Sequence, residues 1–249
     1  MKVSIITAVF NRKNTISRCV ESVLAQSYPN IEYIIIDGGS NDGTLDALAS
    51  FKNGIDVFVS EKDHGIYDAL NKGVTLASGD VIGFLHSDDF FAHCNVIDNI
   101  VSGFSDAVGV DLVYGDLTFF RPNDIDKVTR RYRSNFFRPW MMRFALQPAH
   151  PTVYVNRSFF QQVGMFNQQY RISADFDWLL RAFCIHRCKY KYIPQEMVRM
   201  QQGGASTAGI KALVQHNQED LSILKSHGIV SGWILIVAKL VFKSIQVRI

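Results

Sequence analysis

Two adjacent carboxylates, Asp88 and Asp89, follow a short apolar run, Val81 to Leu85, that is typical of a buried strand. Two negative charges so close together repel each other, which favours a bound cation beside them. Ligands of open α/β sheets bind beyond the carboxyl ends of the strands, where this pair would lie. The pair therefore predicts a site for Mg²⁺ or Mn²⁺ that bridges the phosphates of a substrate. A solvated turn or a helix N-cap is the alternative, because Asp is favoured at both.

Two further acids, Asp175 and Asp177, lie at the start of a predicted helix within Ile172 to Arg181. Acidic residues favour the first helical turn because they offset the partial positive charge of the helix dipole there. Their position alone therefore assigns them no chemistry.

Alternating strands and helices must position these acids. Apolar and β-branched runs predict strands at 2–9, 31–36, 55–59, 81–85 and 111–115. Apolar residues at helical spacing predict helices at 15–27, 45–51, 66–77 and 96–101. Short loops between them predict an α/β fold with a Rossmann-like, mostly parallel and doubly wound sheet. The sequence contains neither G-x-G-x-x-G nor a P-loop, so dinucleotide binding and ordinary ATP hydrolysis lack support.

Composition sets the class of protein. The chain has 249 residues, 47% hydrophobic and 20% charged, which suits one large or two small globular domains. A net charge of +3 is too small to indicate a nucleic-acid partner. We recognise no secretory signal, so we expect a reducing, cytoplasmic setting.

A basic stretch runs from Arg121 to Arg143, where seven Lys and Arg residues face only Asp124 and Asp126 and alternate with aromatic residues. We favour a surface for a membrane or an anionic acceptor. A solvated face with a hydrophobic underside is almost as well supported, and nucleic acid is the weakest alternative.

The last segment, 229–249, contains three basic residues and no acid. Lys239 interrupts its apolar run, which argues against a helix that spans the bilayer. Its pattern predicts an amphipathic helix lying on anionic lipid, which would place the protein on the inner face of the plasma membrane without crossing it. The alternative is a helix whose apolar face packs on the main domain.

Several motifs, taken in their order along the chain, together resemble the inverting, GT-A-fold nucleotide-sugar glycosyltransferases of family 2, in the variant found in bacterial surface-polysaccharide enzymes. The resemblance covers roughly Lys2 to Ser206. Its motifs are VSIITAVFN at 3–11, IIIDGGSNDGT at 34–44, DHGIYDALNKG at 63–73, GDVIGFLHSDD at 79–89, VGMFNQQYRISADFDWLLR at 163–181 and QQGGAS at 201–206.

The resemblance implies a role for each matched residue. Asp175 would be the general base, and Asp88, with Asp89 beside it, would hold the Mg²⁺ or Mn²⁺. The implied donor-binding residues are Thr7, Asn11, Asp37, Asp63, Asn71 and Ser87. The chain departs from the family pattern at three positions, where His86, Ala174 and Gly38 replace acids that are frequent in the family.

The resemblance also implies an organisation and a reaction. Residues 1–115 and 116–228 would be two halves of one domain, the first binding the nucleotide sugar and the second, an α+β extension, the acceptor. Residues 229–249 would form an amphipathic helix that binds the membrane. A sugar would pass, with inversion, from a nucleotide-diphosphate sugar, with UDP favoured, to a hydroxyl of a saccharide or lipid-linked saccharide, in cell-surface polysaccharide synthesis. The alternatives are a nucleotide-sugar-binding module without catalysis and another metal-dependent nucleotidyl or phosphoryl transferase.

Overall fold

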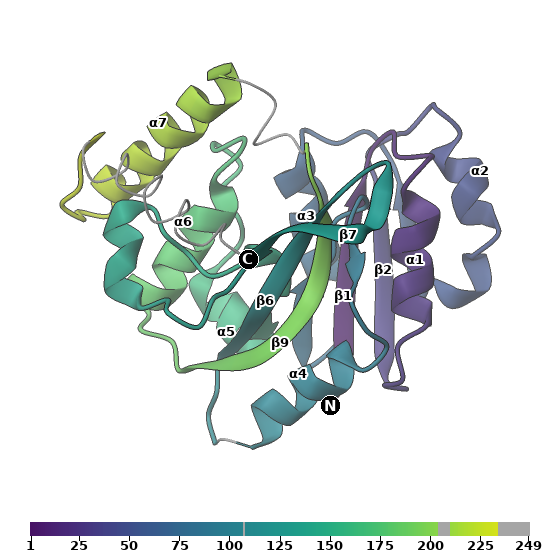
Figure 1. The fold of residues 1–249 in the computed structure, drawn as a ribbon, viewed down its shortest axis with the longest axis horizontal. Coiled ribbons are helices and arrows are strands. Elements are labelled where there is room, and N and C mark those ends of the chain that lie inside the picture. Colours follow the sequence, from purple (N-terminus) through teal and green to yellow (C-terminus); the bar gives the residue numbers. More distant parts are fainter. Residues whose placement is uncertain (107, 204–209, 234–249) are drawn as a thin grey trace.

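The computed structural model describes residues 1–106, 108–203 and 210–233 (Figure 1). Its strands are β1 Val3–Val9, β2 Ile31–Asp37, β3 Val57–Ser60, β4 Val81–Phe84, β5 Phe90–Phe91, β6 Leu112–Arg121, β7 Asp124–Tyr132, β8 Tyr154–Asn156 and β9 Tyr190–Gln201. Its α-helices are α1 Ile16–Leu24, α2 Thr44–Ala49, α3 Ile66–Leu76, α4 Val96–Ser105, α5 Arg157–Val163, α6 Ala174–Leu180 and α7 Ile210–Ser226. Shorter helical segments are η1 Lys52–Gly54, η2 Pro139–Phe144, η3 His150–Thr152 and η4 Arg181–Ile185.

One mixed sheet organises these elements, in the order β3-β2-β1-β4-β8-β6-β9-β5, with β7 paired to β6. β1, β2, β3 and β4 pair in parallel, and so do β6 and β9. The short strand β8 runs antiparallel between β4 and β6, so β6 keeps the direction of β4. The predicted α/β fold with a mostly parallel sheet is confirmed.

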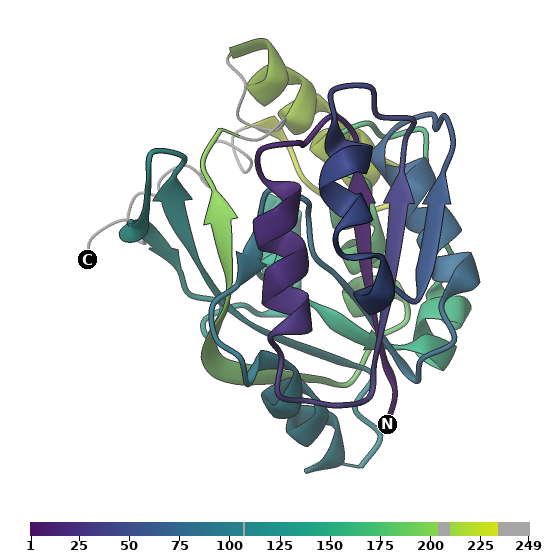
Figure 2. The ribbon, with the colours of Figure 1, turned by 90° about the vertical axis from the view of Figure 1, so that its right-hand side faces the viewer.

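Helices cover both faces of the sheet because each buried strand is apolar on both sides. On β1, Ile6 faces a core completed by α3, α5, α6 and α7. Its neighbour Ile5 faces the opposite core, completed by α1, α2 and α4. Figure 2 shows α1 on the near side of the strands. This two-sided winding directs the carboxyl ends of β1, β2, β3 and β4 to one edge.

The second half of the chain adds a long, curved β6–β7 hairpin beside β9 (Figures 1 and 2). β6 continues past the predicted strand end at Gly115 to Arg121. The boundary between the expected donor-binding and acceptor-binding halves, at residues 115 and 116, therefore falls inside β6, and the two halves share one sheet. The assignment of donor and acceptor binding to these halves stays a prediction.

Helix ends differ from those predicted from the sequence where hydrogen bonds to distant residues replace hydrogen bonds within the helix. α1 ends at Leu24 rather than at Ser27. Beyond it, the Ser27 amide donates to the Cys94 carbonyl at 2.8 Å, and Gln26 Nε2 donates to the His93 carbonyl at 2.8 Å. α4 is longer than predicted and reaches Ser105.

Most of the predicted amphipathic tail, from residue 234 onward, lies outside the described residues, as does part of the QQGGAS motif. No helix among the residues that the structure describes is long and apolar enough to span a bilayer.

Candidate active site

The loops that leave β1 and β2 are tied together at the carboxyl edge of the sheet. Asn11 has a positive φ of 51°, a conformation that Asn adopts more readily than most residues. Its amide donates to Ser40 Oγ at 2.8 Å, and its side-chain Oδ1 accepts from the Asn41 amide at 2.9 Å. Asn11 thereby ties the loop after β1 to the loop after β2, and its predicted contact with a donor stays a prediction.

Asp37 ends β2 and is completely buried. Its Oδ2 accepts from the Gly39 and Ser40 amides, both at 3.0 Å, and from Ser60 Oγ at 2.7 Å. The carboxylate therefore organises the loop after β2 and holds it to β3. Its predicted contact with a base or ribose stays a prediction.

Gly38, one of the departures from the family pattern, is explained by its neighbour Asp63. A Cβ at position 38 would lie 2.3 Å from Asp63 Oδ2, well inside van der Waals contact. Asp63 Oδ1 accepts from the Gly65 amide at 2.9 Å, which fixes the carboxylate there. A side chain at position 38 would require the Asp63 carboxylate to shift, and in this structure the acid beside Gly38 comes from the loop after β3.

Two of the predicted donor-binding residues lie in the scaffold. Thr7 is completely buried, and its hydroxyl lies 3.3 Å from Tyr33 Oη. The Asn71 amide group makes two 3.0 Å hydrogen bonds to the backbone of Phe166, one as donor and one as acceptor. Both side chains thus hold the scaffold together, and their predicted donor contacts remain untested.

The two carboxylates after β4 differ in their exposure to solvent. Asp88 is half-buried, whereas Asp89 is 1% exposed, and Ser87 before them is buried. Asp89 Oδ1 accepts from the Gln201 amide at 3.0 Å, and its buried Oδ2 has no hydrogen-bond partner among the described residues. Burial, followed by the charge of Asp88, raises the pKa of Asp89 well above its ordinary value.

An unpartnered buried carboxylate oxygen beside a more exposed carboxylate fits a hard cation. Within the described ranges, no group of three His, Cys, Asp or Glu side chains is placed to hold a metal ion.

Arg18 is packed against this carboxylate pair. Its guanidinium lies 5.0 Å from the Phe90 ring centroid and 4.9 Å from that of Phe120. One of its nitrogens donates to the Asp88 carbonyl oxygen at 3.1 Å. Burial lowers the pKa of Arg18, while the charges of Asp89 and Asp88 act in the opposite direction. Arg18 thus supplies a fixed positive charge on α1 that partly balances the two acids.

Asp175, at the start of α6, is surrounded by polar side chains from distant parts of the chain. Tyr67 Oη lies 3.0 Å from its Oδ1 and 2.6 Å from the Ile172 carbonyl, so one phenolic proton serves two acceptors. Gln147 Nε2 donates to Asp175 Oδ2 at 3.2 Å, and His150 Nδ1 lies 3.2 Å from the same oxygen. Burial acts to raise the pKa of Asp175, but His150, Tyr67 and Gln147 together lower it.

A small cavity connects this base to the exit of β4. It has a volume of about 60 Å³, and its polar lining consists of His86, His150, Tyr67 and Asp175. The His86 and His150 rings meet edge to face, with centroids 5.7 Å apart. Burial, followed by the charge of His150, lowers the pKa of His86 to about 4, so His86 is neutral at pH 7. The fold therefore brings His86, two residues before Asp88, and the predicted base to the same cavity.

The second early acid of α6 has a different environment. Asp177 is buried and pairs with Arg181 Nε at 3.0 Å and with His227 Nε2 at 2.9 Å. It joins α6 to the end of α7, so of the two acids only Asp175 faces the cavity.

Sequence reasoning assigned no role to Arg18, Tyr67, Gln147 or His150. Tyr67 lies within the DHGIYDALNKG motif at 63–73, but nothing in that motif indicates a partner for Asp175. In the sequence, Arg18 cannot be told apart from the ordinary surface residues of the amphipathic helix α1. Only the packing of α1, α3, η3 and the segment before η3, which carries Gln147, distinguishes these four side chains.

Comparison with known proteins agrees with this geometry. The family model described as Glycosyl transferase family 2 matches residues 4–164. A relative from Mycobacterium bovis, named PGL/p-HBAD biosynthesis glycosyltransferase, is 30% identical over 183 residues, which is 72% of this chain and 69% of the relative. The chain belongs to glycosyltransferase family 2.

Solved structures share the fold at low sequence identity. Staphylococcus aureus TarS 1–349 in complex with UDP-GlcNAc has a TM-score of 0.68 at 14% identity, over 84% of this chain and 62% of that one. Glucosyl-3-phosphoglycerate synthase from Mycobacterium tuberculosis, in complex with Mn²⁺, UDP and phosphoglyceric acid, has a TM-score of 0.65 at 17% identity, over 93% and 80%. These likenesses confirm the predicted GT-A fold.

Proposed function

We propose that this protein transfers a sugar, with inversion, from a nucleotide-diphosphate sugar to a hydroxyl of a saccharide acceptor. The observation that carries the proposal is the cavity that Asp175 lines together with His86, two residues before Asp88. A binding module would not need an ionised carboxylate held by Tyr67 and Gln147 in that cavity. UDP is favoured as the nucleotide, and the TarS and synthase neighbours were solved with UDP-GlcNAc and with UDP.

In the proposed reaction, the acceptor hydroxyl lies against Asp175. The lowered pKa keeps the carboxylate ionised at neutral pH, so it accepts the hydroxyl proton as the oxygen attacks the anomeric carbon. The bond from that carbon to the diphosphate breaks on the opposite face. Because the attack is direct, one displacement inverts the anomeric centre.

Asp88 and Asp89 are proposed to hold Mg²⁺ or Mn²⁺, which, when bound, offsets the charge that develops on the diphosphate. Arg18 donates to the Asp88 carbonyl oxygen, and the Gln201 amide donates to Asp89. The synthase neighbour was solved with Mn²⁺, which supports this cofactor class.

The acceptor is proposed to be lipid-linked, as in cell-surface polysaccharide synthesis, with the protein on the inner face of the plasma membrane. Three exposed side chains around η2 support a membrane surface: Trp140 is 62%, Val230 78% and Trp233 51% exposed. Ser231 Oγ donates to the Arg143 carbonyl at 2.6 Å, which brings the two segments together beside exposed Arg138 and Arg143. Apolar rings flanked by cations suit an anionic lipid surface.

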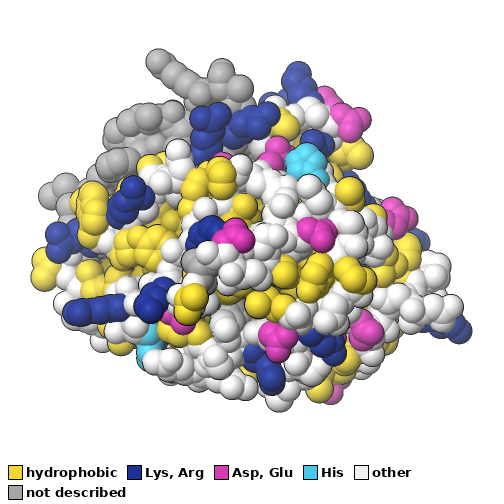
Figure 3. All heavy atoms as spheres, turned by 90° about the horizontal axis from the view of Figure 1, so that it is seen from below, with side chains coloured by type: hydrophobic (Ala, Val, Ile, Leu, Met, Phe, Trp, Pro, Cys, Tyr) yellow, Lys and Arg dark blue, Asp and Glu magenta, His cyan; other side chains and the backbone are white. Residues whose placement is uncertain are grey.

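We propose no nucleic-acid partner, in keeping with the small net charge of +3. On the face drawn in Figure 3, basic, acidic and hydrophobic side chains are interspersed. In the basic stretch, Arg130 stacks 5.1 Å from the Phe119 ring centroid, and Arg131 lies 3.8 Å from Glu196. Part of that stretch thus serves the packing of the hairpin.

Donor binding and donor hydrolysis test the proposal together. We expect UDP-sugars to raise the melting temperature in the presence of Mn²⁺, because a ligand that binds only the folded state stabilises it. Slow release of UDP with water as acceptor should accompany this shift. A shift without any turnover would favour the binding module, and release of the nucleotide monophosphate would favour a nucleotidyl transferase.

A further inference from the structure

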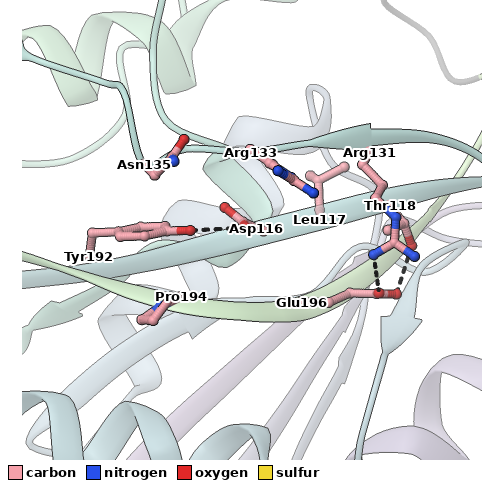
Figure 4. A pocket seen from close by; sticks show the side chains of 9 residues that line it. All are labelled: Asp116, Leu117, Thr118, Arg131, Arg133, Asn135, Tyr192, Pro194 and Glu196. Carbon is pink, nitrogen blue, oxygen red and sulfur yellow. Dashed lines mark hydrogen bonds and ion pairs between the residues drawn. The ribbon is translucent and has the colours of Figure 1, made fainter. Parts of the chain in front are cut away.

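A second, larger cavity lies on the curved half of the sheet, between β6, β9 and the segment that follows β7 (Figure 4). Its volume is about 290 Å³, near the lower end of the roughly 300–1,000 Å³ typical of small-molecule sites. The lining residues are Asp116, Leu117, Thr118, Arg131, Arg133, Asn135, Tyr192, Pro194 and Glu196. None of them belongs to the candidate active site described above.

The two acids of this cavity are held in fixed positions. Asp116 Oδ2 accepts from Tyr192 Oη at 2.9 Å, and its Oδ1 accepts from the Ser134 amide at 2.8 Å. Glu196 Oε1 accepts from Thr118 Oγ1 at 2.8 Å and from Arg199 Nε at 3.1 Å. Each carboxylate oxygen can accept further hydrogen bonds, so both acids still offer acceptor sites to a ligand.

The cavity also offers donors. Arg133 and the side chain of Asn135 make no hydrogen bond or ion pair with the residues that the structure describes, and both are exposed at the cavity wall (Figure 4). Arg131 approaches Glu196 only loosely, at 3.8 Å. The Tyr192 ring and Pro194 add apolar surface beside these polar groups.

We infer that this cavity binds a neutral saccharide unit, namely a sugar ring of the acceptor that lies away from the reacting hydroxyl. This inference rests on the proposed function. Fixed carboxylates and free guanidinium and amide donors together match a ring of hydroxyls, each of which both donates and accepts. The charges of Arg131 and Arg133 offset those of Asp116 and Glu196, so the lining has no net formal charge that would select a phosphate over a neutral sugar.

The cavity wall is connected to the candidate base, which supports an acceptor subsite rather than an isolated surface hollow. Ser134, whose amide bonds to Asp116, accepts from the Ala149 amide through its Oγ at 3.1 Å. Ala149 precedes His150, and Tyr132 Oη donates to the Gln147 carbonyl at 2.6 Å. His150 and Gln147 both contact Asp175, so the hairpin that lines the cavity also holds the partners of the base.

Ligand-observed NMR on the full chain tests this inference, with methyl glycosides of common hexoses and N-acetylhexosamines as neutral probes and inorganic phosphate as the anionic probe. We expect at least one glycoside to bind. Arg133→Gln should weaken that binding by about tenfold, as expected when one hydrogen bond to a charged group is lost. Asn135→Ala should also weaken it. Arg121→Gln is the matched control, because Arg121 is exposed at the end of β6 and does not line the cavity.

Three results would overturn the inference: no glycoside binds, Arg133→Gln binds as the wild type does, or phosphate displaces the glycoside. The Mn²⁺-dependent melting shift with UDP, measured on the same samples, distinguishes this failure from failure of the proposed function. A protein that retains the UDP shift but binds no glycoside lacks this subsite, whereas loss of the UDP shift contradicts the proposed donor site.

Discussion

Tyr67 and Asp175 are 108 residues apart in the chain, yet Tyr67 Oη lies 3.0 Å from Asp175 Oδ1. Tyr67 is on α3, which packs on the parallel strands, and Asp175 opens α6 in the second half of the chain. The contact joins the half that carries the donor motifs to the half that carries the candidate base. It also selects which of the two early acids of α6 can act, because Asp177 is paired with Arg181 and His227.

Asp175→Asn should lower sugar transfer by a factor on the order of 10² or more, because an amide cannot accept the acceptor proton. Donor affinity should stay nearly unchanged, since Asp175 is proposed to face the acceptor. Initial rates of transfer and a UDP titration measure the two effects separately. Asp177→Asn is a poor control because Asp177 holds α6 to α7; Asp46→Asn, at an exposed site on α2, is a suitable one. Collapse of donor affinity in Asp175→Asn would contradict its role as base.

Tyr67→Phe should move the acidic limb of the kcat/KM profile to higher pH. Hydrogen bonding from Tyr67 favours the ionised carboxylate and so contributes to the lowered pKa of Asp175. Its removal raises that pKa, so the base becomes protonated at a higher pH and activity is lost sooner on acidification. Tyr28→Phe removes an exposed hydroxyl that donates to the Met1 carbonyl and should leave the profile unchanged. An unshifted limb in Tyr67→Phe would show that this contact does not tune the base.

Asp88→Asn should abolish Mn²⁺-dependent turnover of the donor while the protein stays folded. Asp88 is half-buried and lies beside the unpartnered Oδ2 of Asp89, so it is the more accessible carboxylate for a cation. Donor hydrolysis across a Mn²⁺ titration is the measurement, with melting temperature as the check on folding. Full Mn²⁺-dependent activity in this variant would refute the assignment.

Glu32→Gln should destabilise the fold without affecting the donor site. Glu32 accepts hydrogen bonds from Lys2 Nζ at 2.7 Å, from the Ser78 amide at 2.8 Å, and from the hydroxyls of Ser4 and Ser78. Burial acts to raise its pKa, but these partners together lower the pKa of Glu32 to about 2. In the unfolded chain the pKa of a glutamate is about 4.3. With an allowance for solvent screening at the partly exposed Lys2, the difference between the two pKa values corresponds to roughly 2 kcal/mol of unfolding free energy at neutral pH.

The sign of the pH dependence follows from that lowered pKa. The contribution of Glu32 is fully present above about pH 4.3 and is lost as the pH falls towards 2. Urea unfolding should therefore separate wild type from Glu32→Gln at pH 7, and the difference should shrink on acidification. Glu21→Gln, at an exposed position of α1, is the control. A difference that is independent of pH would contradict an ionised Glu32 as its source.

Replacement of both Trp140 and Trp233 by Ser should weaken flotation with vesicles that contain phosphatidylglycerol at low salt. The two rings are exposed near Arg138 and Arg143, and interfacial tryptophans anchor proteins at the depth of the lipid headgroups. Phe58→Ser removes an exposed ring on β3, at the far edge of the sheet, and should have no effect. If the wild type does not float with these vesicles, the proposed membrane surface is wrong.

The sequence alone determined the α/β class, the parallel first half and the family. β1, β2 and β4 are buried on both faces, so their continuous apolar runs are visible in the chain, and the polar residues that follow them mark the functional edge of the sheet. Local patterns of this kind depend only on neighbours along the chain. They could not reveal that Asp63 fills the space beside Gly38, or that Tyr67, Gln147 and His150 converge on Asp175. Those contacts join segments about 25 to more than 100 residues apart, and only the folded path of the sheet and its helices brings such segments together.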